Sequence, residues 1–89
     1  MLIDNYSGRY QLTPNLLLDI TRDGDRLFAQ ALVQAIRAPK FEVFAESEKK
    51  FFARVSDKQI TFETAPDGRA TSLILRQAGR PDMPGARLS

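Results

Sequence analysis

The sequence predicts an all-β fold, an antiparallel up-and-down meander of seven or eight strands that forms a small barrel or a strongly curved sheet. In most segments apolar and polar residues alternate with period two, as on a half-buried strand. Asp23-Gly24 and Asp67-Gly68 separate such runs, and Asp-Gly is typical of tight hairpins. The connections are too short for βαβ crossovers, so consecutive strands should pair. Closure into a barrel would remove exposed strand edges.

The N-terminal part of the chain predicts three strands. A short strand around Tyr10 and Leu12 is stopped by Thr13-Pro14-Asn15. In the next strand, within "PNLLLDIT", three apolar residues share one face: Leu16, Leu18 and Ile20. The third strand, Arg26 to Ala31, follows directly after the triplet Asp23-Gly24-Asp25.

The triplet Asp23-Gly24-Asp25 is interpreted as a hairpin turn and not as a metal site. A calcium loop of the EF-hand type needs glycine at its sixth position and glutamate at its twelfth. Counted from Asp23, these positions hold Phe28 and Gln34. Glycine reaches positive φ without steric cost, and aspartate tolerates it, so a turn is the better explanation.

Residues 29–40, "AQALVQAIRAPK", break the strand pattern. Leu32, Val33 and Ile36 have helix-like spacing, and the alanines favour helix. We therefore expect a strand to about Ala31, followed by an irregular or helical excursion that ends at Pro39. The alternative is a long hairpin whose strand continues through Val33.

The C-terminal half predicts the remaining strands. "KFEVFAE" carries Phe41, Val43 and Ala45 in alternation, and "KFFARVS" places Phe51, Ala53 and Val55 on one face. A turn at Ser56-Asp57-Lys58 precedes a hairpin centred on Asp67-Gly68, whose apolar residues are Ile60 and Phe62 before the turn and Leu73 and Leu75 after it. Ala86 to Leu88 would close the structure as a last short strand.

Composition limits the functional classes. A chain of 89 residues predicts one domain spanning 1–89, because two would be too small to bury separate cores. It has neither cysteine nor histidine, which removes thiolate chemistry, the commonest general base and most zinc ligands. A net charge of +2 without a basic cluster argues against nucleic acid as a binding partner.

No segment approaches the length of a membrane span, and the N-terminus lacks the features of a signal peptide. Localisation therefore stays open, and a periplasmic or secreted location would require a longer, exported parent chain.

No residue set predicts catalysis. Ser47 and Lys50 match the Ser-x-x-Lys pattern of serine β-lactamases, but they lie in a polar connector where the lysine would be solvated and the hydroxyl not activated. The acidic residues fall in turns or on outward strand positions. We therefore expect no enzyme, no catalytic residue, no metal and no cofactor.

The interior of the barrel has two interpretations. Its expected residues are Tyr10, Leu18, Phe41, Phe62 and Leu75. Side chains can fill a barrel of about eight strands completely, so core packing is favoured. The alternative is a carrier for a small apolar ligand, which would need a cavity of about 300 Å³ or more.

Several segments resemble a known family. "YSGRYQLTPNLLLDITRDGDRLFAQ", "PKFEVFAESEKKFF", "QITFETAPDGRATSLILRQAGR" and the final "ARL" are similar to small bacterial domains of formally unknown function at the C-terminus of serine β-lactamase-like or penicillin-binding-protein-like hydrolases. The match covers about residues 6–88. The resemblance implies a lipocalin-like barrel and a noncatalytic accessory role, in which the domain contacts or gates a hydrolase or peptidase domain, or aids oligomerisation.

The chain departs from the family pattern between Gln30 and Pro39, where "ALVQAIRA" is longer and more apolar than the usual glycine-containing link. Exposed apolar clusters often mark interfaces. Candidate contact residues for a protein partner are therefore Leu32, Val33, Ile36 and Arg37. Burial of these apolar residues against the barrel is the alternative.

Overall fold

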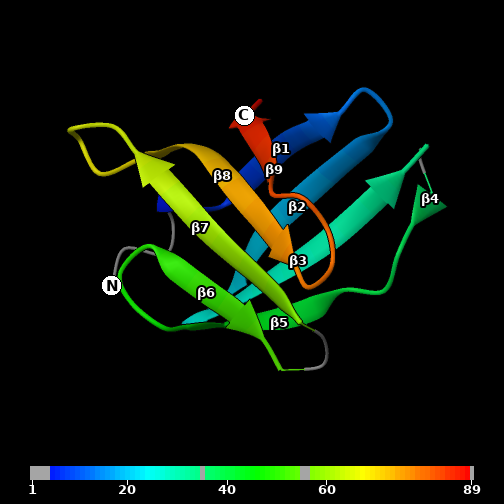
Figure 1. Cartoon of the computed structure of the whole chain (residues 1–89). Helices are drawn as coiled ribbons and strands as arrows, with labels where there is room; N and C mark the ends of the chain where they lie inside the picture. Colours follow the sequence, from blue (N-terminus) through cyan, green and yellow to red (C-terminus); the bar gives the residue numbers. More distant parts are fainter. Residues whose placement is uncertain (1–4, 35, 55–56, 89) are drawn as a thin grey trace.

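A computed structural model describes residues 5–34, 36–54 and 57–88. In these ranges the chain forms nine strands and no α-helix (Figure 1): β1 (Gly8–Thr13), β2 (Leu16–Asp23), β3 (Arg26–Val33), β4 (Ile36–Arg37), β5 (Phe41–Ala45), β6 (Lys50–Ala53), β7 (Lys58–Thr64), β8 (Ala70–Gln77) and β9 (Met83–Arg87). The described residues include no helix long and apolar enough to cross a bilayer.

The strands close into an antiparallel barrel. Each main strand pairs with its neighbours along the chain, and β9 returns to β1 through Tyr10↔Arg87 and Gln11↔Ala86. Pairing of β2 with β3 keeps the ring continuous, so that eight of the described strands form the barrel and β4 is an extra strand on β3. The predicted up-and-down barrel is confirmed.

The first hairpin turn lies at the predicted triplet, one residue later than an Asp-Gly turn would place it. Asp23 pairs with Arg26, so Gly24 and Asp25 are the two central residues. Gly24 has a φ of 65°, whereas Asp25 is not among the residues with positive φ. Positive φ at the first central position alone is the pattern of a type II′ turn, which requires glycine there.

The segment after Ala31 does not form the helical excursion that the sequence favoured. Strand β3 continues to Val33, and Gln34 turns the chain with a φ of 52° before Ile36 pairs with Val33. The expectation was wrong, and the alternative hairpin is correct. Helix propensity is a weak preference, and here the ladder to Leu16 and Leu17 of β2 satisfies the backbone of β3 up to its end.

Strands β4 and β5 run along the same edge of β3 and are separated by a β-bulge. Between the pairs Leu32↔Arg37 and Ala29↔Phe41, β3 contributes two residues and the opposite strand three. One extra residue opposite a regular strand defines a bulge. Pro39, which has no backbone N–H to donate, lies in it. The Gln30 Nε2 donates to the carbonyl of Ala38 at 2.9 Å and satisfies an acceptor there.

One other boundary differs from expectation, and one prediction is not tested. The last strand spans Met83–Arg87 and so begins earlier than Ala86, although the Leu88 amide still donates to Arg9 O at 2.7 Å. Pro84 is exposed and is paired with β8 but not with β1. Its missing backbone N–H is tolerated there because no second strand needs it as a donor. Val55 and Ser56, which belong to the predicted inward face and turn, lie outside the described residues.

Aromatic rings fill one end of the barrel. The rings of Tyr6 and Phe62 stack at 4.5 Å between centroids, and Phe51 meets Phe62 edge-on at 5.6 Å. The Tyr10 hydroxyl donates to Tyr6 O at 2.7 Å, and the Tyr6 hydroxyl donates to Glu48 O at 2.6 Å. Both polar ends therefore have partners, so the rings are buried without an unsatisfied hydroxyl.

The five residues proposed for the interior divide into two groups. Tyr10, Leu18, Phe62 and Leu75 are buried in the core. Phe41 is half-buried and packs against that core from the opposite end of the barrel. The interior is thus densely filled at the aromatic end and less so near Phe41.

Stability should fall at alkaline pH because of Tyr10. Burial raises the pKa of Tyr10 from 10.0 to about 12, although the nearby charge of Arg87 lowers it. Between these pH values the unfolded chain loses the proton while the folded chain keeps it, so the free energy of unfolding decreases as pH rises. We expect a loss of about 1–2 kcal/mol across this window, after allowance for solvent screening.

Urea unfolding at intervals from pH 9 to pH 12 measures this slope. Tyr10→Phe removes the titrating group but keeps the ring, so its slope should be clearly flatter than that of the parent protein. Equal slopes for the two proteins would contradict the assignment to Tyr10.

Candidate functional site

The tip of the β3–β4 hairpin exposes two apolar side chains. Val33 is 50% exposed and Ile36 is 72% exposed, and they are direct cross-strand partners. Leu88, the other large apolar residue exposed among the described ranges, follows β9. Leu32, by contrast, is only 9% exposed and pairs with Leu17 and Arg37. Of the apolar residues proposed for contact, the structure therefore presents Val33 and Ile36 to solvent and buries Leu32.

Backbone hydrogen bonds hold this hairpin tip, defined by its described residues Val33, Gln34, Ile36 and Arg37. The Gln34 amide donates to Asn15 O at 3.0 Å, which ties the tip to the β1–β2 turn. The Ala38 amide donates to Ala31 O at 2.9 Å and continues the β3–β4 ladder. Positive φ at a non-glycine residue such as Gln34 is uncommon and needs this kind of support.

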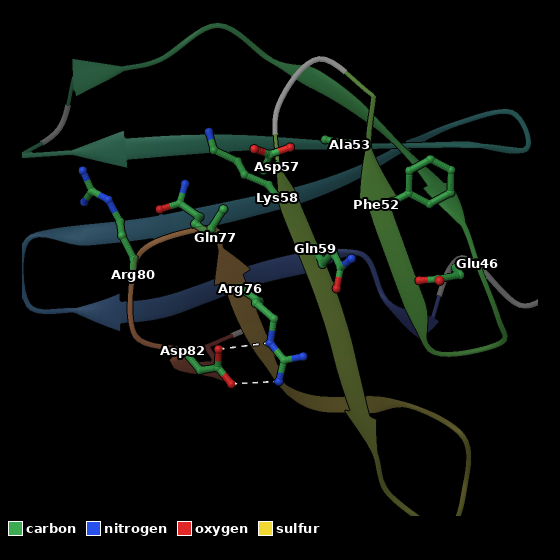
Figure 2. Close-up of a pocket in the computed structure, with 11 residues that line it drawn as sticks. Glu46, Phe52, Ala53, Asp57, Lys58, Gln59, Arg76, Gln77, Arg80 and Asp82 are labelled. Atoms are coloured by element: carbon green, nitrogen blue, oxygen red, sulfur yellow. Dashed lines mark hydrogen bonds and ion pairs between the residues drawn. The ribbon is translucent and has the colours of Figure 1, made fainter.

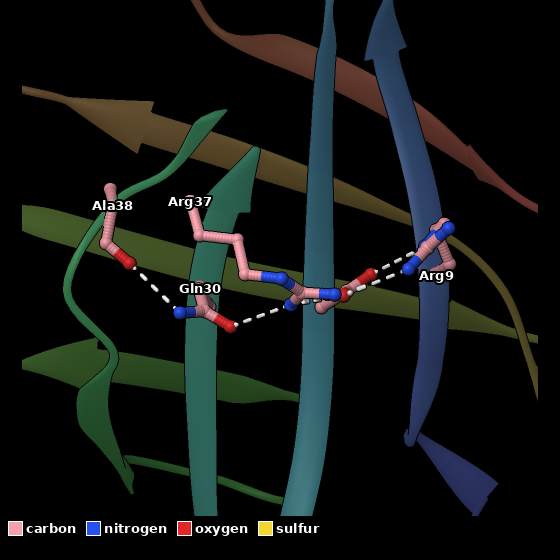
Figure 3. A network of polar contacts seen from close by, with 5 residues as sticks. Arg9, Gln30, Arg37 and Ala38 are labelled. Carbon is pink, nitrogen blue, oxygen red and sulfur yellow. Dashed lines mark hydrogen bonds and ion pairs between the residues drawn. The ribbon is translucent and has the colours of Figure 1, made fainter. Parts of the chain in front are cut away.

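Arg37 belongs to a polar network on the outer face of the barrel (Figure 3). Its Nη1 donates to Gln30 Oε1 at 3.1 Å and lies 3.7 Å from Asp19 Oδ2. The same carboxylate accepts two hydrogen bonds from Arg9, at 2.8 and 3.2 Å. Hydrogen bonding to Asp19, and the attraction of its charge, raise the pKa of Arg9. Arg37 is thus oriented by side chains of β2 and β3 and linked through Asp19 to β1.

The residues weighed for metal binding and catalysis lie apart from one another. Asp23 and Asp25 are exposed in the first hairpin turn, and within the described residues no three acidic side chains form a group that could hold a metal ion. Ser47 is exposed, and its amide donates to Lys50 O at 3.1 Å. The Lys50 ammonium faces Glu46 at 4.0 Å and does not contact the serine hydroxyl.

A cavity of about 180 Å³ lies at the less densely filled end of the barrel. Its wall is mainly apolar and includes Leu12, Leu18, Ala31, Phe41, Leu75 and Met83. These residues come from β1, β2, β3, β5, β8 and β9 at the end opposite the aromatic cluster. The volume is below the roughly 300 Å³ needed to enclose a drug-sized ligand. A carrier that surrounds its whole ligand is therefore not supported by this cavity.

The rim of this cavity is polar, and we call it the barrel mouth: Lys58, Gln77 and Arg80. Figure 2 shows these three side chains above the Arg76–Asp82 pair, with Asp57 next to Lys58, and all of these residues also line a wider hollow. The Lys58 ammonium lies 4.9 Å from the centroid of the Phe41 ring, in the geometry of a cation–π contact. Among the described residues, neither Lys58 nor Arg80 forms an ion pair.

A wider, open hollow of about 660 Å³ lies on the outside of β6, β7 and β8 (Figure 2). Arg76 crosses part of it and donates to both carboxylate oxygens of Asp82 at 3.0 and 3.1 Å. Hydrogen bonding to Arg76 lowers the pKa of Asp82, and the same bond raises the pKa of Arg76. Both groups are therefore kept charged, which suits an ion pair and not proton transfer.

Sequence reasoning did not find the barrel mouth. The signal available was topological: in an up-and-down meander alternate connections meet at the same end of the barrel. The turn at Thr13-Pro14-Asn15, the hairpin tip, the residues before Lys58 and the loop that contains Arg80 are such alternate connections. Counting the connections along the chain is enough to place Lys58 and Arg80 at the same end of the barrel as the hairpin tip.

A protein-family model described as "Domain of unknown function (DUF3471)" matches residues 2–87. No curated protein matches the chain. No solved structure matches it either.

Proposed function

The chain belongs to the DUF3471 family of domains of unknown function, and from this premise we propose that it is a noncatalytic accessory domain that binds another protein through the hairpin tip. The partner proposed is the catalytic domain of a serine β-lactamase-like hydrolase or peptidase, in accordance with the resemblance described above. Contact with that domain would place the barrel where it can gate the active site. Self-association through the same surface is the other form that the contact can take.

The observation that carries this proposal is the paired exposure of Val33 and Ile36. Single exposed apolar residues are normal on protein surfaces, but here two are neighbours across one short hairpin. The exposed Arg37 follows Ile36 but lies on the other face of the hairpin, where it contacts Gln30 and Asp19, and arginine and apolar residues are both typical of interfaces. Because the hairpin is already fixed by its hydrogen bonds, little conformational entropy is lost when a partner covers it.

The noncatalytic part of the proposal is supported by the positions of the candidate reactive groups. Ser47 is solvated, and the carboxylates of Asp23 and Asp25 lie on an exposed turn. Catalysis by such groups would require a base or an oxyanion site within hydrogen-bond reach and shielded from water. Neither Ser47 nor this turn has such surroundings among the described residues.

Sedimentation velocity tests the proposal. The domain is run alone and mixed with catalytic domains of the serine β-lactamase-like hydrolases encoded in the same genome, and hydrolysis of a chromogenic substrate is followed in parallel. We expect a complex or a self-associated species, and Ile36→Ser should weaken it at least about tenfold, because a buried isoleucine side chain contributes about 1.5–3 kcal/mol.

Leu88→Ser is the matched control, since Leu88 is 54% exposed but lies outside the hairpin tip. It should leave association unchanged. A strictly monomeric domain that neither binds a hydrolase nor alters its activity would overturn the proposal, as would equal effects of the two substitutions.

A further inference from the structure

The barrel mouth and the cavity below it have the chemistry of a binding site. We infer that this site binds a small organic anion, a carboxylate that carries one apolar group of about the size of a benzene ring. The apolar group would enter the cavity, and the carboxylate would remain at the rim beside Lys58 and Arg80. The inference concerns a ligand and does not depend on the protein contact proposed above.

The volume of the cavity sets the size of the apolar group. An apolar protein cavity of about 150 Å³ stays dry and binds benzene. The cavity here, at about 180 Å³, is lined by Leu12, Ala31, Leu75 and other apolar side chains. A phenyl group or a short branched alkyl group would therefore fit, whereas a larger ligand would have to leave most of its surface outside.

The charge of the rim sets the chemistry of the other end of the ligand. Lys58 and Arg80 both line the cavity, and within the described ranges neither forms an ion pair. Asp57 lines an adjoining hollow with Lys58, Gln77 and Arg80, so these two cations face one carboxylate and the rim keeps a net positive charge. Asp82, which follows Arg80 closely in the chain, is already bound by both donors of Arg76. Two such cations at the edge of an apolar cavity favour an anion, and a carboxylate can accept hydrogen bonds from both side chains.

Gln77 adds a neutral polar group to the same rim. Its side chain lines the cavity between the two cations, and it is half-buried at the end of β8. An amide has two N–H donors and a carbonyl acceptor. It can therefore satisfy a carboxylate oxygen that Lys58 and Arg80 do not reach, without adding a third charge.

A titration of the ¹⁵N-labelled protein with phenylacetate, followed by amide chemical shifts, tests the inference. We expect shifts confined to residues around the cavity, with a dissociation constant on the order of 1 mM for a ligand of this size. Acetate, which lacks the apolar group, and 2-phenylethylammonium, which reverses the charge, should each bind at least about tenfold more weakly. These comparisons use the unmodified protein, so they remain decisive if a variant fails to fold.

Two variants separate the contributions of the cavity and of the charge. Ala31→Leu adds apolar volume inside the cavity and should abolish the phenylacetate shifts. Arg80→Gln should weaken phenylacetate several-fold but leave binding of neutral benzyl alcohol unchanged. Arg69→Gln is the matched control: it removes the same charge from an exposed position in the β7–β8 loop, and it should have no effect.

Three results would overturn the inference. The first is an absence of localised shifts at 20 mM phenylacetate, a concentration about twenty times the expected dissociation constant. The second is binding that Ala31→Leu does not change. The third is equal affinity for phenylacetate and 2-phenylethylammonium, which would mean that Lys58 and Arg80 do not select the charge.

Discussion

Phe62→Ala should lower the free energy of unfolding by about 3–5 kcal/mol, the usual cost of truncating a fully buried phenylalanine. Phe62 is 1% exposed and touches three other aromatic rings: Tyr6, Tyr10 and Phe51. The hole left by its ring cannot collapse easily, because strands of a closed barrel are held on both sides by hydrogen bonds. Since small domains have only about 5–15 kcal/mol in total, the variant should be close to unfolding.

Denaturant unfolding followed by far-ultraviolet circular dichroism measures this loss. Phe44→Ala is the matched control, because Phe44 lies on the outer face, half-buried, near Phe52 and under the guanidinium of Arg54. We expect it to cost about 1 kcal/mol or less, since removal of a half-buried ring from the outer face leaves no cavity in the core. If Phe62→Ala does not fold, Phe62→Leu gives a smaller but measurable loss. Equal losses for Phe44→Ala and Phe62→Ala would contradict the assignment of Phe62 to the core.

The barrel was predictable because its signals are local. Alternation of Leu16, Leu18 and Ile20 identifies a strand and its inward face together, since the side-chain period of a strand is two. The Asp-Gly pairs mark hairpin turns for an equally local reason, which is the positive φ of glycine at Gly24 and Gly68. Closure then follows from topology, because a meander of this length leaves its first and last strands side by side.

The β3–β4 hairpin was mispredicted because its local signals conflict. Ala29, Ala31 and Ala35 raise helix propensity, and the apolar residues between them have helical spacing. What decides the structure is the pairing of Leu32 and Val33 with β2, a contact with residues far away in the sequence. The extra residue in the bulge at Pro39 shifts the alternation of side chains by one. When pairing with β3 starts again at Phe41, Val43 therefore points into the barrel.

The barrel mouth could not be read from residue types alone. Lys58 and Arg80 lie 22 positions apart in the chain, and neither belongs to a recognisable motif. They line the same cavity only because β7 starts, and β8 ends, at the same end of the barrel. The role of Arg87 could not be read from its residue type either, because its side chain donates to the carbonyls of Asn5 and Ser7, which lie 82 and 80 positions earlier in the chain.

Arg87→Met should also destabilise the protein strongly, by about 2–4 kcal/mol. The guanidinium of Arg87 donates to three backbone carbonyls, those of Asn5 at 3.1 Å, of Ala70 at 3.0 Å and of Ser7. Hydrogen bonds from a charged donor contribute about 1.5–3 kcal/mol each but are not additive. Loss of this donor would release the segment before β1, which carries the Tyr6 ring of the aromatic cluster.

Denaturant unfolding gives the size of the effect, and hydrogen exchange shows where it occurs. We expect amides of residues 6–10 to exchange faster in Arg87→Met, with the hairpin tip less affected. Arg87→Lys should recover less than half of the loss, because the three N–H donors of an ammonium diverge from a single nitrogen, whereas the guanidinium reaches the three carbonyls from two separate nitrogens.

Arg26→Met provides the comparison with an exposed ion pair. Arg26 makes a two-point contact with Glu42, but the pair lies at the surface, where solvent screens it. Its removal should have little effect on unfolding. If Arg26→Met and Arg87→Met destabilise equally, or if Arg87→Lys is as stable as the parent, the carbonyl contacts of Arg87 do not hold the N-terminal segment in place. The charge of Arg87 also lowers the pKa of Tyr10 in the intact protein, and Arg87→Met removes this effect.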